Sequence, residues 1–139
     1  MKLNTRGWLS GIGALLLAVA ASVPAWSQVA PTAAEATRYA GLHAAAQRGD
    51  AAAVRALAGP GTNLDARDGY GRTALHVATF ARQREAIRAL AQAGADLNLR
   101  ENDRYDAVTI ASVADDEETL RLLLSLGGSA KQVTSRWDG

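Results

Sequence analysis

The chain has 139 residues with 15 basic and 14 acidic side chains, and it contains no cysteine. This length allows a single domain, and the lack of cysteine excludes disulfide bonds and thiolate chemistry. The nearly balanced charge gives no reason to expect binding to nucleic acid or to an anionic membrane.

The first 27 residues have the layout of a secretory signal peptide. Lys2 and Arg6 precede an apolar run over 11–23, and Pro24 then interrupts the run. In Ala25-Trp26-Ser27, the small residues Ala25 and Ser27 stand at the two positions that a signal peptidase recognises. The apolar run is shorter than the roughly 20 residues of a membrane span, although an uncleaved anchor is the alternative. We therefore expect cleavage after Ser27, a periplasmic or secreted protein, and no membrane attachment of the mature chain.

Residues 28–37 are predicted to form a lead-in and the start of a capping helix. Thr32 and Glu35 have the spacing of a capping box, in which each residue satisfies a backbone donor of the other. We expect the helix that begins there to continue to about Gln47. This helix would cover the outer face of the first repeat, because a terminal repeat lacks a neighbour on that side.

The following sequence repeats with a period of 33 residues. Leu42-His43 returns as Leu75-His76, and the glycine at 61 returns at 94 and 127. The leucine at 57 likewise returns at 90 and 123. A constant period over three units predicts a stack of repeats, which presents an extended surface.

The middle unit shows the helices of the repeat most clearly. Asp68-Gly69-Tyr70-Gly71 is a turn sequence, and Thr73 can cap a short apolar helix that follows it. A second helix is expected from Arg84, and Gly94 is expected to end it. Each unit therefore predicts two helices and a loop.

This pattern resembles the ankyrin repeat. The matching residues of the middle unit are Asp68, Gly71, Thr73, Leu75, His76, Ala78, Glu85, Ile87, Leu90, Gly94, Ala95, Asp96, Leu97 and Asn98. The resemblance implies an all-α solenoid of about three helix-turn-helix repeats with hairpin-like loops. The repeats would occupy 38–67, 68–100 and 101–133, and an incomplete fourth repeat would start at 134–139.

Several positions depart from the family pattern. Arg82 stands where the family has a glycine between the helices, so we expect either a left-handed conformation, at a cost of roughly 1 kcal/mol, or a shifted turn. Asp115 holds the matching place in the third unit and tolerates this conformation better. Arg104-Tyr105 replaces the turn glycine region of the third loop, so we expect its tip to be distorted.

The C-terminal end of the stack is predicted to be open. Val108, Ile110, Leu120 and Leu123 would pack on a fourth unit if one were present. Bare, they would form an exposed apolar patch, which is typical of association surfaces. We therefore expect either a longer repeat array or self-association through this end.

No group of residues predicts catalysis, a metal site or a cofactor. His43 and His76 occupy equivalent positions in stacked units, about 10 Å apart, which is too far for one ion. The family resemblance implies instead that this histidine orders the start of the helix. The acidic run 115–118 lacks the ligand spacing of a calcium loop and is interpreted as a solvated helix N-terminus. We therefore do not expect an enzyme.

The resemblance implies binding of another protein through the concave face and the loop tips. The corresponding residues are Gln47 and Arg48 in the first unit, Tyr70, Arg72, Phe80 and Ala81 in the second, and Asp103, Tyr105, Val113 and Ala114 in the third. Tyrosine, phenylalanine and arginine are enriched in interfaces, although Phe80 could instead pack on a neighbouring repeat. The alternative function is a structural or assembly role through the open C-terminal end.

Overall fold

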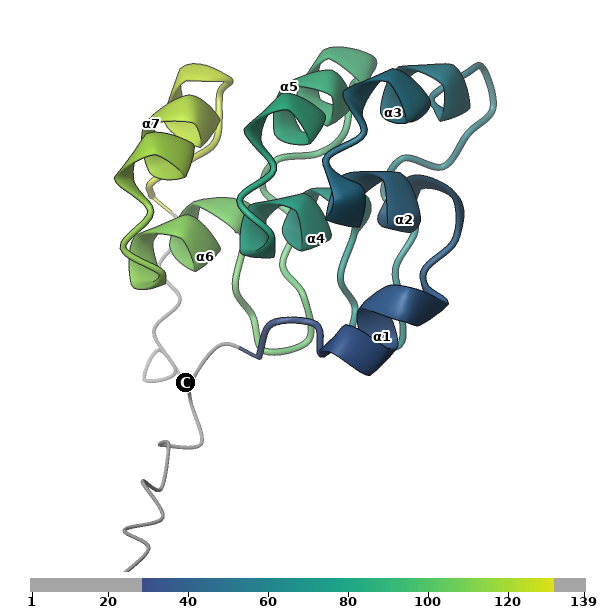
Figure 1. The fold of residues 1–139 in the computed structure, drawn as a ribbon. Helices are drawn as coiled ribbons and strands as arrows, with labels where there is room; N and C mark the ends of the chain where they lie inside the picture. Colours follow the sequence, from purple (N-terminus) through teal and green to yellow (C-terminus); the bar gives the residue numbers. More distant parts are fainter. Residues whose placement is uncertain (1–28, 132–139) are drawn as a thin grey trace, which may run out of the picture.

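The computed structural model describes residues 29–131, which form a stack of helix pairs (Figure 1). The helices are α1 (Ala33–Arg38), α2 (Gly41–Arg48), α3 (Ala51–Leu57), α4 (Ala74–Phe80), α5 (Arg84–Ala93), α6 (Ala107–Val113) and α7 (Glu117–Ser125). The expected all-α repeat solenoid is confirmed for this part of the chain. The predicted signal peptide and the predicted start of a fourth repeat at 134–139 lie outside the described residues.

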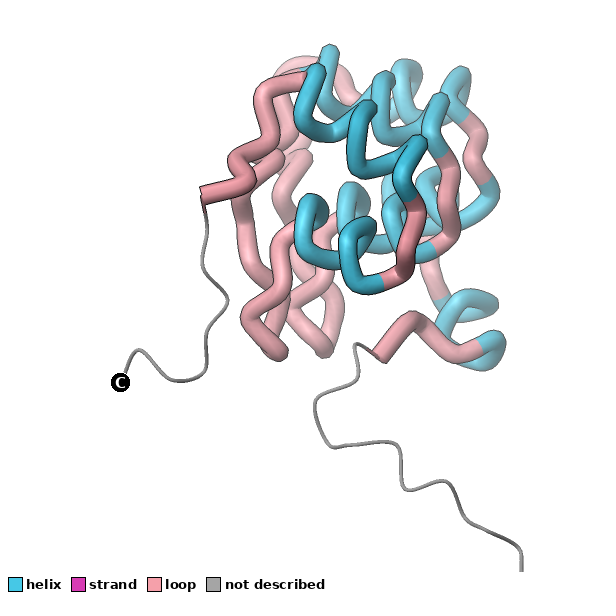
Figure 2. Tube along the Cα trace, turned by 90° about the vertical axis from the view of Figure 1, so that its left-hand side faces the viewer, coloured by secondary structure: helices cyan, strands magenta, loops and turns pink. Residues whose placement is uncertain are grey.

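The paired helices form two parallel rows. Helices α2, α4 and α6 make the inner row beside the loops, and α3, α5 and α7 make the outer row (Figures 1 and 2). Because consecutive units stack in this way, the loops that join them all project from the inner row. This arrangement places the loop tips and the inner helices on one side of the molecule.

Short polar side chains start four of these helices. The side chains of Asp50, Thr73, Asp106 and Asp116 accept hydrogen bonds from backbone N–H groups in the first turns of α3, α4, α6 and α7. Such a cap is worth about 1 kcal/mol because it satisfies a donor that the helix leaves free. Helices α2 and α5 end at Gly49 and Gly94, which both have left-handed conformations. These local signals fix the helix boundaries.

The core lies between the two rows. Val54, Leu75, Ile87, Leu90 and Leu123 are each no more than 2% exposed. Burial of one such side chain stabilises the fold by about 1.5–3 kcal/mol. Many of the remaining core residues are alanines, which allow the helices to approach closely.

Side chains also join successive loops. The Asp65 Oδ1 atom accepts from the Asp96 N–H at 3.0 Å, and Asn98 Oδ1 accepts from the Ser129 N–H at 2.9 Å. The Asn102 N–H donates to the Tyr70 carbonyl at 3.0 Å. The loops therefore form a continuous layer, held by bonds that recur with the repeat.

The tip of the third loop is regular, so the expected distortion is wrong. Arg104 has φ 72°, close to the φ of 73° at Gly71 in the preceding loop. Glu101 accepts from the N–H groups of Asp103 and Tyr105, as Asp68 accepts from those of Tyr70 and Arg72. Hydrogen bonding thus holds the turn in shape although a non-glycine residue occupies it. The left-handed conformation expected at Arg82 is confirmed, with φ 56°.

Replacing Arg104 by glycine is expected to stabilise the protein by about 0.5–1 kcal/mol. Glycine relieves the left-handed strain, although it also raises the entropy of the unfolded chain. Urea denaturation measures the effect. Gly71→Ala is the control and should destabilise, because its Cβ would lie 3.1 Å from the Asn102 backbone nitrogen at a φ of 73°. A loss of stability in Arg104→Gly would contradict the assignment of strain.

The apolar residues expected to lie bare at the C-terminal end are largely covered, so that part of the expectation is wrong, whereas a longer array or self-association through this end stays a prediction. Val108, Ile110 and Leu123 are 6%, 0% and 0% exposed, and Leu120 is half-buried. Helices α6 and α7 cover each other, and Gly128 lies so close that a Cβ there would be 2.9 Å from Val108 Cγ2. Of the four residues that were expected to form an exposed patch, Val108, Ile110 and Leu123 are therefore buried and Leu120 is partly covered.

Candidate functional site

Arg72 is buried, although the sequence predicted an exposed residue at a loop tip. The residue is 1% exposed. Its Nη2 atom donates to the Val29 carbonyl at 2.8 Å. Its Nη1 atom lies 3.7 Å from Glu35 Oε1 and 3.6 Å from Asp68 Oδ2. The prediction that Arg72 is accessible to a partner is wrong, because residues 29–39, here called the N-terminal segment, cover it.

Two aromatic rings complete the surroundings of this guanidinium. The Arg72 Cζ atom lies 4.3 Å from the centroid of the Tyr70 ring and 6.0 Å from that of Phe80. Both distances allow a cation–π attraction. Tyr70 is 51% exposed, whereas Phe80 is half-buried. We call Glu35, Tyr39, Asp68, Tyr70, Arg72 and Phe80 the Arg72 cluster.

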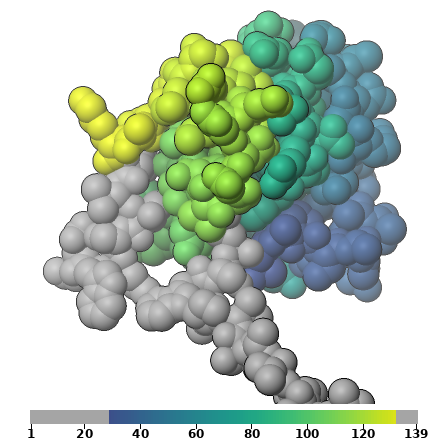
Figure 3. All heavy atoms as spheres, turned by 60° about the vertical axis from the view of Figure 1, so that its left-hand side comes forward, coloured from purple at the N-terminus to yellow at the C-terminus, as the bar shows by residue number. Residues whose placement is uncertain are grey.

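The N-terminal segment lies below α2 and beside the loops in Figure 1, and its dark-blue atoms lie in the lower part of the molecule in Figure 3. In Figure 1 it does not stack on the α2–α3 pair as a terminal cap would. The predicted capping box of Thr32 and Glu35 is confirmed, and it starts α1. The predicted continuous helix to Gln47 is wrong, because α1 ends at Arg38 and α2 begins at Gly41. The extended backbone between them allows the Tyr39 hydroxyl to donate to Asp68 Oδ2 at 2.7 Å. This contact fixes the segment against the second loop.

The acidic groups of the cluster are held ionised. The pKa of Glu35 is lowered to about 2. The largest causes are hydrogen bonds from the backbone and side chain of Thr32, and a bond from Tyr70 and the Arg72 charge add to them. Burial would raise the pKa of Asp68, but bonds from Tyr39, Arg72 and Tyr70 together lower it. Burial, followed by the bond to Asp68, raises the pKa of Tyr39 to about 12. At neutral pH the cluster therefore contains one cation and two carboxylates.

Acid is expected to release the N-terminal segment. The lowered pKa of Glu35, from 4.5 to about 2, means that its contribution is complete above pH 4.5 and is lost as the pH falls toward 2. Amide chemical shifts of 33–38 measure the release, with those of α5 as the reference for intact repeats. In Glu35→Gln these shifts should not change with pH in this window. A wild-type response identical to that of the variant would contradict the role of Glu35.

The other predicted partner-binding residues are spread over the same side of all three units. Tyr70, Arg72 and Phe80 meet at one point, whereas the other seven lie at the ends of inner helices and at the third loop tip. Val113 is 60% exposed, and Arg48, Asp103 and Ala114 are also exposed. Gln47, Ala81 and Tyr105 are half-buried. Among these seven residues, only Val113 is a large apolar side chain that is strongly exposed.

Sequence reasoning missed a second charged group, between the second and third units. Asp116 was interpreted as solvated, but it is 5% exposed and lies 3.4 Å from Arg84 Nη2 and 3.8 Å from Arg82 Nε. Burial would raise its pKa, but bonds from Thr119 and Arg84 lower it. The sequence did contain a signal for the capping role of Asp116, because this residue lies two periods of the repeat after Asp50, which is also a helix cap.

His76 orders the start of its helix, as the family resemblance implied, whereas His43 does not. His76 is 1% exposed; its Nδ1 atom accepts from the Thr73 N–H at 2.9 Å and its Nε2 atom donates to the Leu99 carbonyl at 2.8 Å. His43 lacks an equivalent threonine, because Ala40 precedes its helix. Its Nε2 atom is 2.9 Å from the Arg72 carbonyl. Within residues 29–131, no group of three potential ligands could hold a metal ion.

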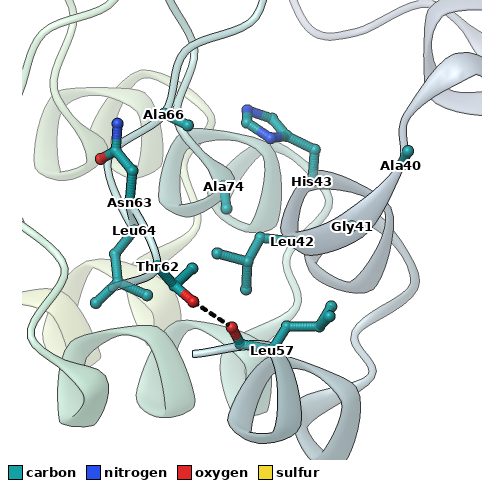
Figure 4. Close-up of a pocket in the computed structure, with 10 residues that line it drawn as sticks. All are labelled: Ala40, Gly41, Leu42, His43, Leu57, Thr62, Asn63, Leu64, Ala66 and Ala74. Atoms are coloured by element: carbon teal, nitrogen blue, oxygen red, sulfur yellow. Dashed lines mark hydrogen bonds between the residues drawn. The ribbon is translucent and has the colours of Figure 1, made fainter. Parts of the chain in front are cut away.

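An apolar pocket of about 400 Å³ lies beside the first repeat (Figure 4). Leu42, Leu57 and Leu64 line it, together with Ala40, Ala66 and Ala74. Its polar groups are engaged, since the Thr62 hydroxyl donates to the Leu57 carbonyl at 2.8 Å. Leu57 is 43% exposed, whereas its repeat equivalent Leu90 is fully buried. The pocket thus offers mainly apolar surface, and the His43 side chain in its lining is already hydrogen-bonded to the Arg72 carbonyl.

Comparisons with known proteins support the fold. A family model described as ankyrin repeats (3 copies) matches residues 37–135. The crystal structure of the human ASB11 ankyrin repeat domain is similar, with a TM-score of 0.60 and 23% sequence identity. The match covers 68% of this chain and 43% of that one, so this chain spans less than half of its length. No curated protein matches the sequence. None of the described helices has the length and apolar character needed to cross a membrane.

Proposed function

We infer that this chain, which belongs to the ankyrin-repeat family, is an exported module that binds another protein through its loop tips and inner helices. Ankyrin repeats are generally protein–protein interaction modules and typically lack catalytic activity. Fold alone does not identify a partner, so the location of the binding surface must come from the residues of this chain.

One observation carries the binding surface. Tyr70 and Val113, which are 51% and 60% exposed, both lie on the side of the loops and the inner helices. Tyr70 is also held in place, because its N–H donates to Asp68 Oδ1 at 2.8 Å and its ring stacks on Arg72. An aromatic side chain that is already ordered loses little entropy on binding, which favours it as an anchor.

Two double variants test this surface. Tyr70→Ala with Val113→Ala removes the exposed anchors, whereas Leu57→Ala with Leu124→Ala removes side chains that are 43% and 41% exposed on outer helices. Phe80 is kept, because its half-buried ring packs near Arg72. We expect the first variant to lose at least about tenfold in affinity for the partner, as loss of an anchor typically does. Far-ultraviolet circular dichroism checks the fold of both variants.

The partner is first captured by crosslinking from an extract of exported proteins. Titration of the main partner then measures the affinity of each variant. Equal binding by the two double variants would exclude the proposed surface.

Export rests on the signal-peptide layout and has its own test. Mass spectrometry of the protein recovered from its native compartment should give a first residue of Gln28, and an intact Met1 in that material would contradict export by cleavage.

A further inference from the structure

We propose that the Arg72 cluster is a recognition site for a segment of a partner protein that presents a carboxylate, and that the N-terminal segment occupies this site in cis. A partner would then bind by displacing residues 29–39. This inference rests on the proposed function and adds the chemistry of the partner.

The second loop builds the receiving part of the site without help from the N-terminal segment. Asp68 accepts from the N–H groups of Tyr70 and Arg72 at 2.8 Å each, and the Asp68 N–H donates to the Arg72 carbonyl at 2.9 Å. These bonds direct the Arg72 side chain past the Tyr70 ring toward Phe80. The guanidinium is therefore placed by residues of the repeat itself.

The N-terminal segment supplies the groups that this guanidinium needs. Val29 provides a carbonyl, Glu35 a carboxylate and Tyr39 a hydroxyl that donates to Asp68. A guanidinium has five N–H donors in a rigid fork, so a carboxylate and a carbonyl are its natural partners. The contacts in cis thus define the ligand as a segment that combines a carboxylate, an accessible carbonyl and a hydroxyl donor.

The segment is attached by few contacts, so it can be displaced. None of the residues of α1 is buried, and this helix has only six residues. Isolated helices of fewer than about 12 residues are marginal in water. The segment is therefore held by its polar contacts with the second loop and by the partly buried Tyr39 ring, whereas α2 is anchored in the core by Ala45 and Ala46. Release of residues 29–39 would leave the packed repeats intact.

Displacement can be measured with a peptide in trans. The probe is a fluorescein-labelled peptide of residues 29–40, titrated by anisotropy with the mature chain 28–139. We expect Glu35→Gln with Tyr39→Phe, which weakens the segment in cis, to bind the probe at least about tenfold more tightly than the wild type, because the competing segment is released. Glu35→Gln alone, at a partly exposed position, serves if the double variant does not fold.

Two controls test the recognition chemistry. A probe that itself carries Glu35→Gln should bind at least about tenfold more weakly, and so should the original probe when Arg72→Lys is added to the released variant, because the fork is lost. A scrambled peptide of the same composition should not compete. Equal binding of the probe to wild type and released variant would overturn the proposal. Binding that persists with the altered probe, with Arg72→Lys or with the scrambled peptide would also overturn it.

Failure of this proposal can be separated from failure of the proposed function. If the probe fails while Tyr70→Ala with Val113→Ala still abolishes partner binding, the site for a carboxylate-bearing segment is excluded and the wider binding surface stands. If the probe binds as expected while both double variants retain the partner equally, the Arg72 cluster stands and the wider surface is excluded.

Discussion

Replacing Leu90 by alanine is expected to lower the free energy of unfolding by about 2–5 kcal/mol, the usual cost of a leucine deletion in a packed core. Leu90 is 0% exposed and belongs to the cluster that joins the two rows of helices. Small domains are typically stable by only about 5–15 kcal/mol, so this one change removes a large part of the total. Urea denaturation followed by circular dichroism measures the loss.

The matched control comes from the repeat itself. Leu57 occupies the equivalent position one period earlier and is 43% exposed, so Leu57→Ala should cost about 1 kcal/mol or less. The same chemical change thus has two expected sizes because Leu90 is enclosed in the core, whereas Leu57 is partly open to solvent at the start of the stack. Equal losses at the two positions would show that the first unit is more tightly packed in solution than the structure indicates.

Replacing Arg72 by alanine is expected to cost about 3–5 kcal/mol, because it removes one partner of a buried charge group and leaves the others unsatisfied. The side chains of Asp68 and Glu35 are 12% and 19% exposed, and this partial hydration places the expected loss toward the lower end of the range. The variant should also lose protection of residues 33–38 from amide hydrogen exchange. Denaturation and exchange together distinguish loss of the docked segment from unfolding of the repeats.

Arg88→Ala is the control for this variant. Arg88 pairs with Glu85 at 3.4 Å, but the two side chains are 47% and 70% exposed. An exposed pair of this kind contributes about 0–1 kcal/mol. Similar losses in Arg72→Ala and Arg88→Ala would mean that burial of the Arg72 cluster adds nothing to stability, which would contradict its structural role.

The position of the N-terminal segment changes how the binding face is understood. The family resemblance placed Arg72 at an open loop tip, but the segment shields it and leaves Tyr70 exposed above it. The open surface of this side therefore consists of one face of Tyr70, Val113 and the neighbouring polar residues. The guanidinium beneath becomes available only when residues 29–39 move away.

The sequence alone determined the repeat and most of its helices, but not the break between α1 and α2. Hydroxyl and carboxylate caps at Asp50, Thr73 and Asp106, glycines with left-handed conformations, and the helical spacing of apolar residues act within a few positions of the chain. The role of His76 was likewise readable, because its partner Thr73 lies three residues away. Such signals are local, so they are present in the order of the residues.

Only the tertiary structure decided what depends on distant or neighbouring units. Val29 and Arg72 meet although 43 positions separate them, and Arg84 meets Asp116 across 32 positions. Leu57 and Leu90 are identical in the repeat register, yet one is exposed and the other buried. His43 and His76 are also equivalent in the register but differ in their hydrogen bonds. Thr73 orients His76, whereas Ala40 stands in the place of the threonine that would orient His43. The period specifies equivalent positions, but burial and charge pairing depend on what each unit has on either side, and the two ends of a stack differ from its middle.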